Sequence, residues 1–381
     1  MKVTHKHLTL KLKTILLLVI VLCYTNASAT NNSLSYKLGG ALRFGYKKAS
    51  WNSEHNKNGG NFLYDVFRLN LDAKYKHLGL CLDYRFYSSA SGGSMLKHGY
   101  MTYDLADKHT FQVGLIPVSH GIMPVGSNSF LLNMNYLFGL EDDADMGAGY
   151  VYDDGKWRID ATFFKNADWI NSGEVSASRY GFDVGGTDKE ENQMNVYLHR
   201  RWGNSVKQEV GICGAYGGLH NIKENMMGSR YSYALHYTLD YNNWNLKAQF
   251  SHYNMRPYRK EGEPTDHIIM TGLGGSHKIA SKANVYLASL SYKIPINKGI
   301  IDEICLFNDF NVIKKRIEGA KNSYQNILGM VITAGNIITY IDWAWAKNNP
   351  DFGKNSKEGF VKGSKNSKWD NLIYINFGYY F

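Results

Sequence analysis

The sequence predicts an all-β protein, a transmembrane antiparallel β-barrel of about sixteen strands, and three observations support this fold class. The last segment carries apolar side chains at every second position, Ile373, Ile375, Phe377, Tyr379 and Phe381, and the chain ends on that phenylalanine. About fourteen to sixteen similar segments precede it, each with the period of two that is typical of strands. Short and long connections alternate between them, as in outer-membrane barrels with short periplasmic turns and long extracellular loops.

Residues 1–29 read as a secretory signal peptide. Four lysines precede an apolar run over 15–24, and small residues at 27–29 form a cleavage site. The alternative, a retained membrane anchor, needs an apolar run of roughly 20 residues. We therefore expect export, with residues 30–381 forming the barrel domain.

The composition excludes several classes of protein. No helix-length apolar run follows residue 29, so membrane insertion requires a closed barrel. The formal net charge is +10, but the basic residues are spread over many short segments, so a nucleic-acid partner is not predicted. Cys81, Cys213 and Cys305 each stand alone, which argues against a disulfide framework or a zinc site.

The first strand is predicted over 34–50, where Leu42 and Phe44 alternate with Arg43. The same period continues in the next four predicted strands, near 62–75, 80–87, 101–105 and 111–115. Tyrosines are frequent, 28 in all, and many fall at strand ends, as in the aromatic girdles of membrane barrels. Tyrosine also suits strands in general, so this observation supports the barrel without proving it.

Eight long connections and seven short turns give sixteen strands with both chain ends on the periplasmic side. The long connections are predicted near 51–61, 88–94, 118–144, 167–191, 218–229, 256–281, 312–322 and 348–368. The short turns fall at 76–79, 107–108, 153–155, 203–204, 242–243, 297–299 and 335–336. Their Asn, Asp and Gly residues tolerate the positive φ of tight hairpins. Fourteen or eighteen strands remain open, because 267–274 could add a strand pair.

A barrel of this size encloses an aqueous channel. Basic residues whose strand parity points them into the lumen are Arg43, Arg68, Lys74, Arg85, Arg158, Arg201 and Lys247. Basic side chains in a confined pore attract anions, so a weak anion preference is predicted. The alternative is that any water-filled lumen is lined by charges of both signs.

The connection 118–144 is the predicted constriction, because an apolar run over 130–138 favours folding inward against the wall. The alternative is an extracellular loop packed on other loops or on a second subunit. The connection ends in an acidic cluster made of Glu141, Asp142, Asp143 and Asp145. Its spacing lacks the glycine and the distal glutamate of a calcium loop. We therefore predict a charged constriction or a clamp to lumen arginines, and no metal site.

Several short motifs are similar to those of one known family. They are Gly114-Leu115-Ile116-Pro117, Gly121-Ile122-Met123-Pro124, the stretch from Tyr136 through 139–147, 163–167, 323–326, 340–342 and 378–381. With these motifs the chain resembles the phosphate-selective porin O and P family, in the version found in Bacteroides-like bacteria. The resemblance implies a trimeric sixteen-stranded channel in a Gram-negative outer membrane, narrowed by its third loop. Phosphate-selective members place basic side chains at the constriction, whereas this chain has no Lys or Arg between Lys108 and Lys156.

The predicted function is that of a porin for passive diffusion of small polar or anionic solutes, without cofactor or enzymatic activity. Expected partners are outer-membrane lipid, lipopolysaccharide, two further copies of the chain, and the barrel-assembly machinery, which would read Phe377, Tyr379 and Phe381. A surface-binding or adhesive barrel is the alternative, using loop charges at 258–261 and 354–368. A barrel hydrolase is the next alternative, but adjacent Ser119 and His120 lack a third catalytic group at a convincing spacing. A soluble secreted β-sandwich would not explain the terminal phenylalanine.

Overall fold

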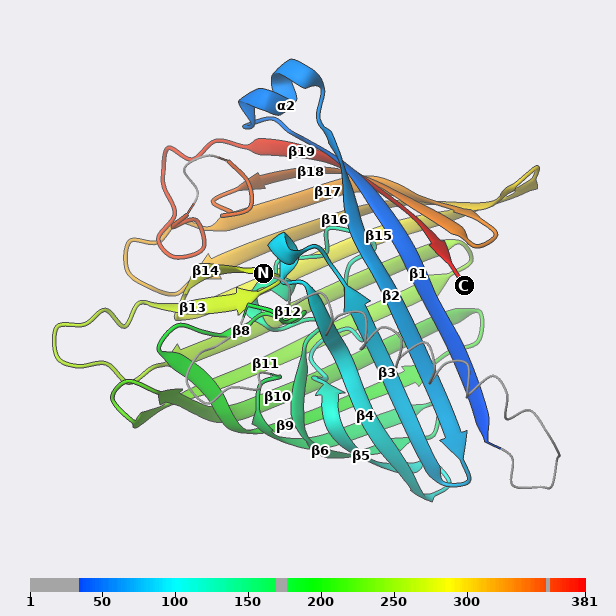
Figure 1. Ribbon diagram of the computed structural model, residues 1–381, viewed down its shortest axis with the longest axis horizontal. Coiled ribbons are helices and arrows are strands. Elements are labelled where there is room, and N and C mark those ends of the chain that lie inside the picture. The colour runs from blue at the N-terminus through cyan, green and yellow to red at the C-terminus, as the bar shows by residue number, and fades with distance from the viewer. Residues whose placement is uncertain (1–33, 169–176, 354–356) are drawn as a thin grey trace, which may run out of the picture.

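Sixteen antiparallel strands close into one barrel in the computed structural model, which describes residues 34–168, 177–353 and 357–381. The predicted barrel of about sixteen strands is therefore confirmed within these ranges. Both ends of the barrel wall lie at the end that carries the short turns (Figure 1). The predicted signal peptide, 1–29, lies outside the described residues. None of the helices in the described ranges has the length and apolar character to span a bilayer.

The barrel strands are β1 (Ser35–Ala49), β2 (Asn61–Tyr75), β3 (Leu78–Phe86), β4 (Ser94–Ala106), β5 (His109–Pro117), β6 (Ala144–Asp153), β7 (Trp157–Asn166), β9 (Asp188–Trp202), β10 (Val206–Asn221), β11 (Met226–Tyr241), β12 (Trp244–Arg256), β15 (Lys282–Lys298), β16 (Ile301–Lys315), β17 (Ser323–Ala334), β18 (Ile337–Lys347) and β19 (Asp370–Tyr380). Three short helices lie in the connections, α2 (Ser53–Asn58), η1 (Ser89–Ser91) and η2 (Tyr136–Phe138).

The last strand closes the barrel against the first. In the register of β19 with β1, Phe377 lies opposite Phe44 and Tyr379 lies opposite Leu42. The main chain of Phe381 then exchanges two hydrogen bonds with Gly40, of 2.9 and 3.2 Å. A Cβ atom at Gly40 would stand 2.4 Å from the main-chain oxygen of Arg68 and 2.6 Å from the Phe381 ring, so the glycine makes room for both.

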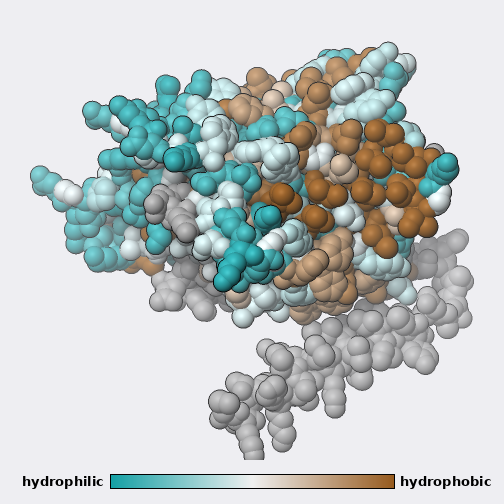
Figure 2. All heavy atoms as spheres, turned by 90° about the horizontal axis from the view of Figure 1, so that it is seen from above, coloured by the Kyte–Doolittle hydropathy of each residue, from teal (hydrophilic) through white to brown (hydrophobic). Residues whose placement is uncertain are grey.

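The outer face of the wall is apolar and the inner face is largely polar. On adjacent strands Ile212 and Leu235 are 55% and 53% exposed, whereas the next residue of β11, His236, is 1% exposed. Hydrophobic residues gather in a broad area on the wall, between a hydrophilic loop end and a hydrophilic rim at the turns (Figure 2). This alternation, with an apolar band outside, is the pattern of a barrel that faces lipid.

The structure corrects two predicted connections. The connection expected over 218–229 spans only 222–225, because β10 and β11 continue into it. Its glycines suggest a loop but lie in strands, and a Cβ atom at Gly228 would stand 2.3 Å from the main-chain oxygen of Arg256. The possible extra strand pair at 267–274 is not part of the wall: β13 (His267–Gly272) pairs with β14 (Gly275–Ala280) and β8 (Asp183–Val184) in a separate inner sheet.

Candidate functional site

The connection between β5 and β6, residues 118–143 (the lumen segment), passes through the inside of the barrel. In the ring of sixteen strands, β16 is the eighth strand from β5 in either direction. The main-chain N–H groups of Asn128 and Ser129 nevertheless donate to Asp309 Oδ2 on β16, at 2.9 and 2.8 Å. A segment that starts on one wall of a closed ring and binds the opposite wall must cross its interior.

Further wall side chains accept hydrogen bonds from the main chain of the lumen segment. Its anchors on β18, β16 and β12 are Leu131 N to Asp342 Oδ2 (3.0 Å), Met134 N to Asn311 Oδ1 (2.9 Å) and Ile122 N to Gln249 Oε1 (2.8 Å). A buried segment without regular structure must find partners for its main-chain N–H groups. The polar inner face of the wall supplies them here.

A hydrophobic core fills the loop end of the barrel interior. Phe138 of the lumen segment packs there with Phe182, Met270 of the inner sheet, Tyr253 of the wall and Phe360. The rings of Phe138 and Phe360 lie 4.9 Å apart, and those of Phe138 and Tyr253 lie 5.5 Å apart. Loops far apart in sequence therefore share one core inside the barrel mouth.

The structure pairs most of the predicted pore-lining basic residues with carboxylates. The ion pairs are Arg43 with Asp65 (2.8 Å), Lys74 with Asp104 (2.7 Å), Arg85 with Asp83 (3.0 Å), Arg158 with Asp160 (2.8 Å) and Arg201 with Glu209 (2.6 Å). Lys247 Nζ instead donates to Asn128 Oδ1 of the lumen segment, at 3.1 Å. Strand parity indicates the inward direction of these residues but not their partners.

Four cations form a row across the inner face of β1 to β4, which we call the basic row: Arg43, Arg68, Arg85 and Lys97. Arg68 lies opposite Arg85 in register and stacks over the ring of Tyr380 at 5.3 Å. Within the described residues Arg68 forms no ion pair, unlike the other three. Sequence reasoning missed Lys97, because it began the fourth strand at 101 whereas β4 begins at Ser94.

The acidic cluster does not act as one group. Asp142 is bound by Lys97 Nζ at 2.6 Å and accepts a hydrogen bond from the Tyr180 hydroxyl at 2.7 Å. Burial opposes its ionisation, but these two partners outweigh burial and lower the pKa of Asp142. The acidic cluster was predicted to bind arginines of the lumen, but its member Asp142 binds a lysine, Lys97. Glu141 turns elsewhere and accepts from Asn133, and its burial raises its pKa to about 8.

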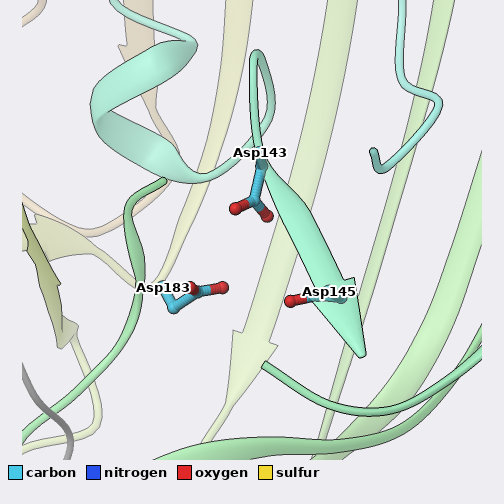
Figure 3. A group of neighbouring side chains, drawn as sticks. All are labelled: Asp143, Asp145 and Asp183. Carbon is cyan, nitrogen blue, oxygen red and sulfur yellow. The ribbon is translucent and has the colours of Figure 1, made fainter. Parts of the chain in front are cut away.

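The other two members of the cluster meet a third aspartate. Asp143 and Asp145 lie with Asp183 of β8 so that one carboxylate oxygen from each is within 4.8 Å of the others. All three point into a common space (Figure 3). Burial, Asp183 and Asp145 raise the pKa of Asp143 well above its ordinary range. Asp183 was missed from the sequence because it stands forty positions away and carries no local signal.

Ser119 and His120, the pair weighed for a barrel hydrolase, contact different groups. The Ser119 hydroxyl donates to Asp160 Oδ2 at 2.6 Å, whereas His120 Nδ1 lies 3.5 Å from Cys213 Sγ. Burial and the charge of Arg230 lower the pKa of His120 to about 3. The imidazole is therefore neutral at physiological pH and is not the hydrogen-bond partner of the neighbouring serine.

No family model and no curated protein sequence matches this chain. Solved structures share its fold at low sequence identity. The anion-selective porin from Comamonas acidovorans is 12% identical with a TM-score of 0.57, over 92% of this chain and 100% of that one. The fold is that of outer-membrane porins. The outer membrane channel DcaP of Acinetobacter baumannii (11% identity, TM-score 0.60, 93% and 99% covered) and OmpT of Vibrio cholerae (11%, 0.57, 93% and 100%) share it.

These comparisons confirm the predicted fold class. Sequence identities of 11–12% show the fold but not the family. Membership of the phosphate-selective porin O and P family therefore stays a prediction.

Proposed function

We propose that this protein is an outer-membrane porin that passes small polar or anionic solutes by passive diffusion, with the lumen segment as its constriction. The crossing of the barrel from β5 to Asp309 on β16 carries the proposal. A sixteen-stranded barrel is wide enough for an aqueous channel. A segment anchored on the opposite wall narrows such a channel and fixes where solutes pass.

The charges around this segment favour anions. Asp309 on β16 and Asp342 on β18 are occupied by main-chain N–H groups of the segment. On β1 to β4, the basic row contains Arg68, which has no carboxylate partner in the described residues and is only half-buried. An unpaired guanidinium in a narrow, poorly screened space attracts anions. Phosphate preference is not part of the proposal, because the segment itself carries no Lys or Arg.

The cellular setting follows from the same proposal. We infer that residues 1–29 direct export, that the apolar outer face meets outer-membrane lipid and lipopolysaccharide, and that the strand ending in Phe381 is read by the barrel-assembly machinery. A homotrimer is proposed from the resemblance. Fractionation of cells, with cross-linking of the extracted protein, tests location and subunit number together.

The direct test is the reversal potential of the refolded protein in a planar bilayer across a KCl gradient. We expect stepwise conductance with a potential directed toward chloride, and a smaller potential in Arg68→Gln. A potential directed toward potassium would overturn the anion preference and assign control to the acidic residues of the segment.

A second function, a ligand-binding barrel with little conductance, is favoured by one observation. The hydrophobic core around Phe138 occupies the loop end of the lumen and leaves this end more closed than a simple pore requires. Absence of conductance steps from correctly folded protein, verified by its heat-modifiable migration, would support this alternative over the porin.

A further inference from the structure

We propose that Asp143, Asp145 and Asp183, the aspartate triad, bind one divalent cation of the calcium type inside the barrel. Oxygens from all three carboxylates lie within 4.8 Å of one another. Two oxygens on opposite sides of a Ca²⁺ ion, each at about 2.4 Å, stand about 4.8 Å apart. The three carboxylates therefore lie close enough together for one such ion to contact an oxygen of each (Figure 3).

The orphaned oxygens of the triad point to a missing ligand. Asp145 is 2% exposed, has no ion pair or side-chain hydrogen bond in the described residues, and aims at Asp183. Asp183 enters from a different element, β8 of the inner sheet, and is 1% exposed with Oδ1 unpartnered. Buried polar atoms normally have a partner, and buried charges are paired or coordinate metals.

The surrounding cations do not neutralise the triad. Arg179 is shared between Asp168 (3.2 Å) and Asp183 (2.5 Å), and Arg230 is paired with Glu190. Asp168, Asp183 and Glu190, together with Asp143 and Asp145, make five carboxylates. In the described part of the chain, two guanidiniums, Arg179 and Arg230, face them. A divalent cation would remove most of this excess of negative charge.

The space beside the triad is kept open by a glycine. A Cβ atom at Gly181 would stand 2.1 Å from Asp143 Oδ1, so any other residue would displace that carboxylate. The three ligands come from the end of the lumen segment, the start of β6 and the inner sheet. A bound ion would therefore tie the inner sheet to the wall beside the constriction. Ca²⁺ suits such a site better than Mg²⁺, because it tolerates irregular oxygen geometry and dehydrates more readily.

Calorimetric titration of CaCl₂ into the full chain, refolded in detergent without lipopolysaccharide and stripped with chelator, tests the site. We expect one Ca²⁺ per chain with a Kd of roughly 1 mM or tighter, and weaker binding of MgCl₂. Asp145→Asn, which removes a carboxylate without breaking an ion pair, should weaken Ca²⁺ binding at least about tenfold. Asp107→Asn, in the exposed turn after β4, is the matched control and should bind as the wild type does.

Thermal unfolding with and without Ca²⁺ provides the second measurement, and it is independent of conductance. Calcium should raise the unfolding temperature of the wild type and of Asp107→Asn but not of Asp145→Asn. The proposal is overturned if the wild type shows no saturable binding up to about 10 mM, or if Asp145→Asn binds equally well. It is also overturned if Asp145→Asn stabilises the protein while calcium has no effect on the wild type, because the triad would then be held neutral by protons.

Discussion

Two neighbouring stretches of the barrel wall, β1 to β4 and β16 to β18, use their charges differently. On β1 to β4, the basic row meets carboxylates of the wall and of Asp142, and Arg68 alone is left without one in the described residues. On β16 and β18, Asp309 and Asp342 form no ion pair within the described residues and accept hydrogen bonds from main-chain N–H groups of the lumen segment. Both stretches therefore hold the segment, β16 and β18 through its main-chain N–H groups and β4 through the ion pair of Lys97 with Asp142. In the described residues, β1 to β4 also present Arg68, a cation without a carboxylate partner, to whatever passes.

The difference shows that the residues that position the lumen segment and the residue expected to set ion preference are largely different ones. Main-chain hydrogen bonds to buried carboxylates position residues 128–131 of the segment without using the side chains of those residues. Ion pairs on β1 to β4 cancel most of the charge there, so selectivity depends on Arg68, which remains unpaired in the described residues. Changing Asp309 or Asp342 should alter anchoring, and changing Arg68 should alter ion preference.

The largest effect is expected on the anchoring wall. Asp309→Ala removes the acceptor of two main-chain N–H groups and of the Ser289 hydroxyl. Hydrogen bonds to charged groups contribute about 1.5–3 kcal/mol each, so we expect the free energy of unfolding in urea to fall by roughly 3 kcal/mol. Single-channel current should become larger and noisier as the segment detaches, and protease should cut the segment more readily.

Asp302→Ala is the control for that change, since Asp302 lies on the same strand but is exposed at the turn end, where it accepts from Gly335 N. It should leave the single-channel current unchanged. Equal current and noise in wild type and Asp309→Ala would show that β16 does not hold the segment.

The internal contacts of the segment provide the next comparison. Burial raises the pKa of Glu141 from the ordinary 4.5 to about 8, so the folded protein keeps this proton over a pH range in which the unfolded chain releases it. Stability is therefore expected to fall as pH rises from about 4.5 to about 8, by a few kcal/mol in total. Glu141→Gln preserves the acceptor for Asn133 and should abolish this decline.

Urea unfolding of both proteins at several pH values measures the effect. Parallel pH profiles for wild type and Glu141→Gln would contradict it. A decline confined to the wild type would show that the segment is stabilised by its own buried contacts as well as by the wall.

A smaller effect is expected on the charged wall. Arg68→Gln removes the unpaired cation of the basic row. Because Arg68 forms no ion pair in the described residues, the change deprives no carboxylate there of its partner. A unit charge about 4 Å from a permeating ion in water contributes about 1 kcal/mol, which is roughly fivefold in the ratio of chloride to potassium permeability. The reversal potential in a KCl gradient measures this ratio, and an unchanged potential would remove Arg68 from the ion path.

The sequence specifies these two walls unequally. Alternation in strands such as β1 and β19 predicts both the wall and its closure, because a period of two is a local property. The apolar run in the lumen segment favours inward folding, but nothing local indicates that Asn128 reaches β16. The partnerships of Lys97 with Asp142 and of Asp183 with the acidic cluster join residues distant in sequence. Such contacts depend on how the loops fill the lumen, which periodicity does not encode.

The smallest effect is expected where the charged wall meets bulk water, and it sharpens the contrast with Arg68. Lys74 lies on the same strand, β2, but at the turn end, where its side chain is 59% exposed and paired with Asp104. Lys74→Gln removes the same unit of charge as Arg68→Gln. An exposed ion pair is screened by water and salt, so the expected change is at most about 0.5 kcal/mol, or roughly twofold in permeability ratio. If the two variants shift the reversal potential equally, selectivity follows the net charge of the wall and not the unpaired guanidinium within it.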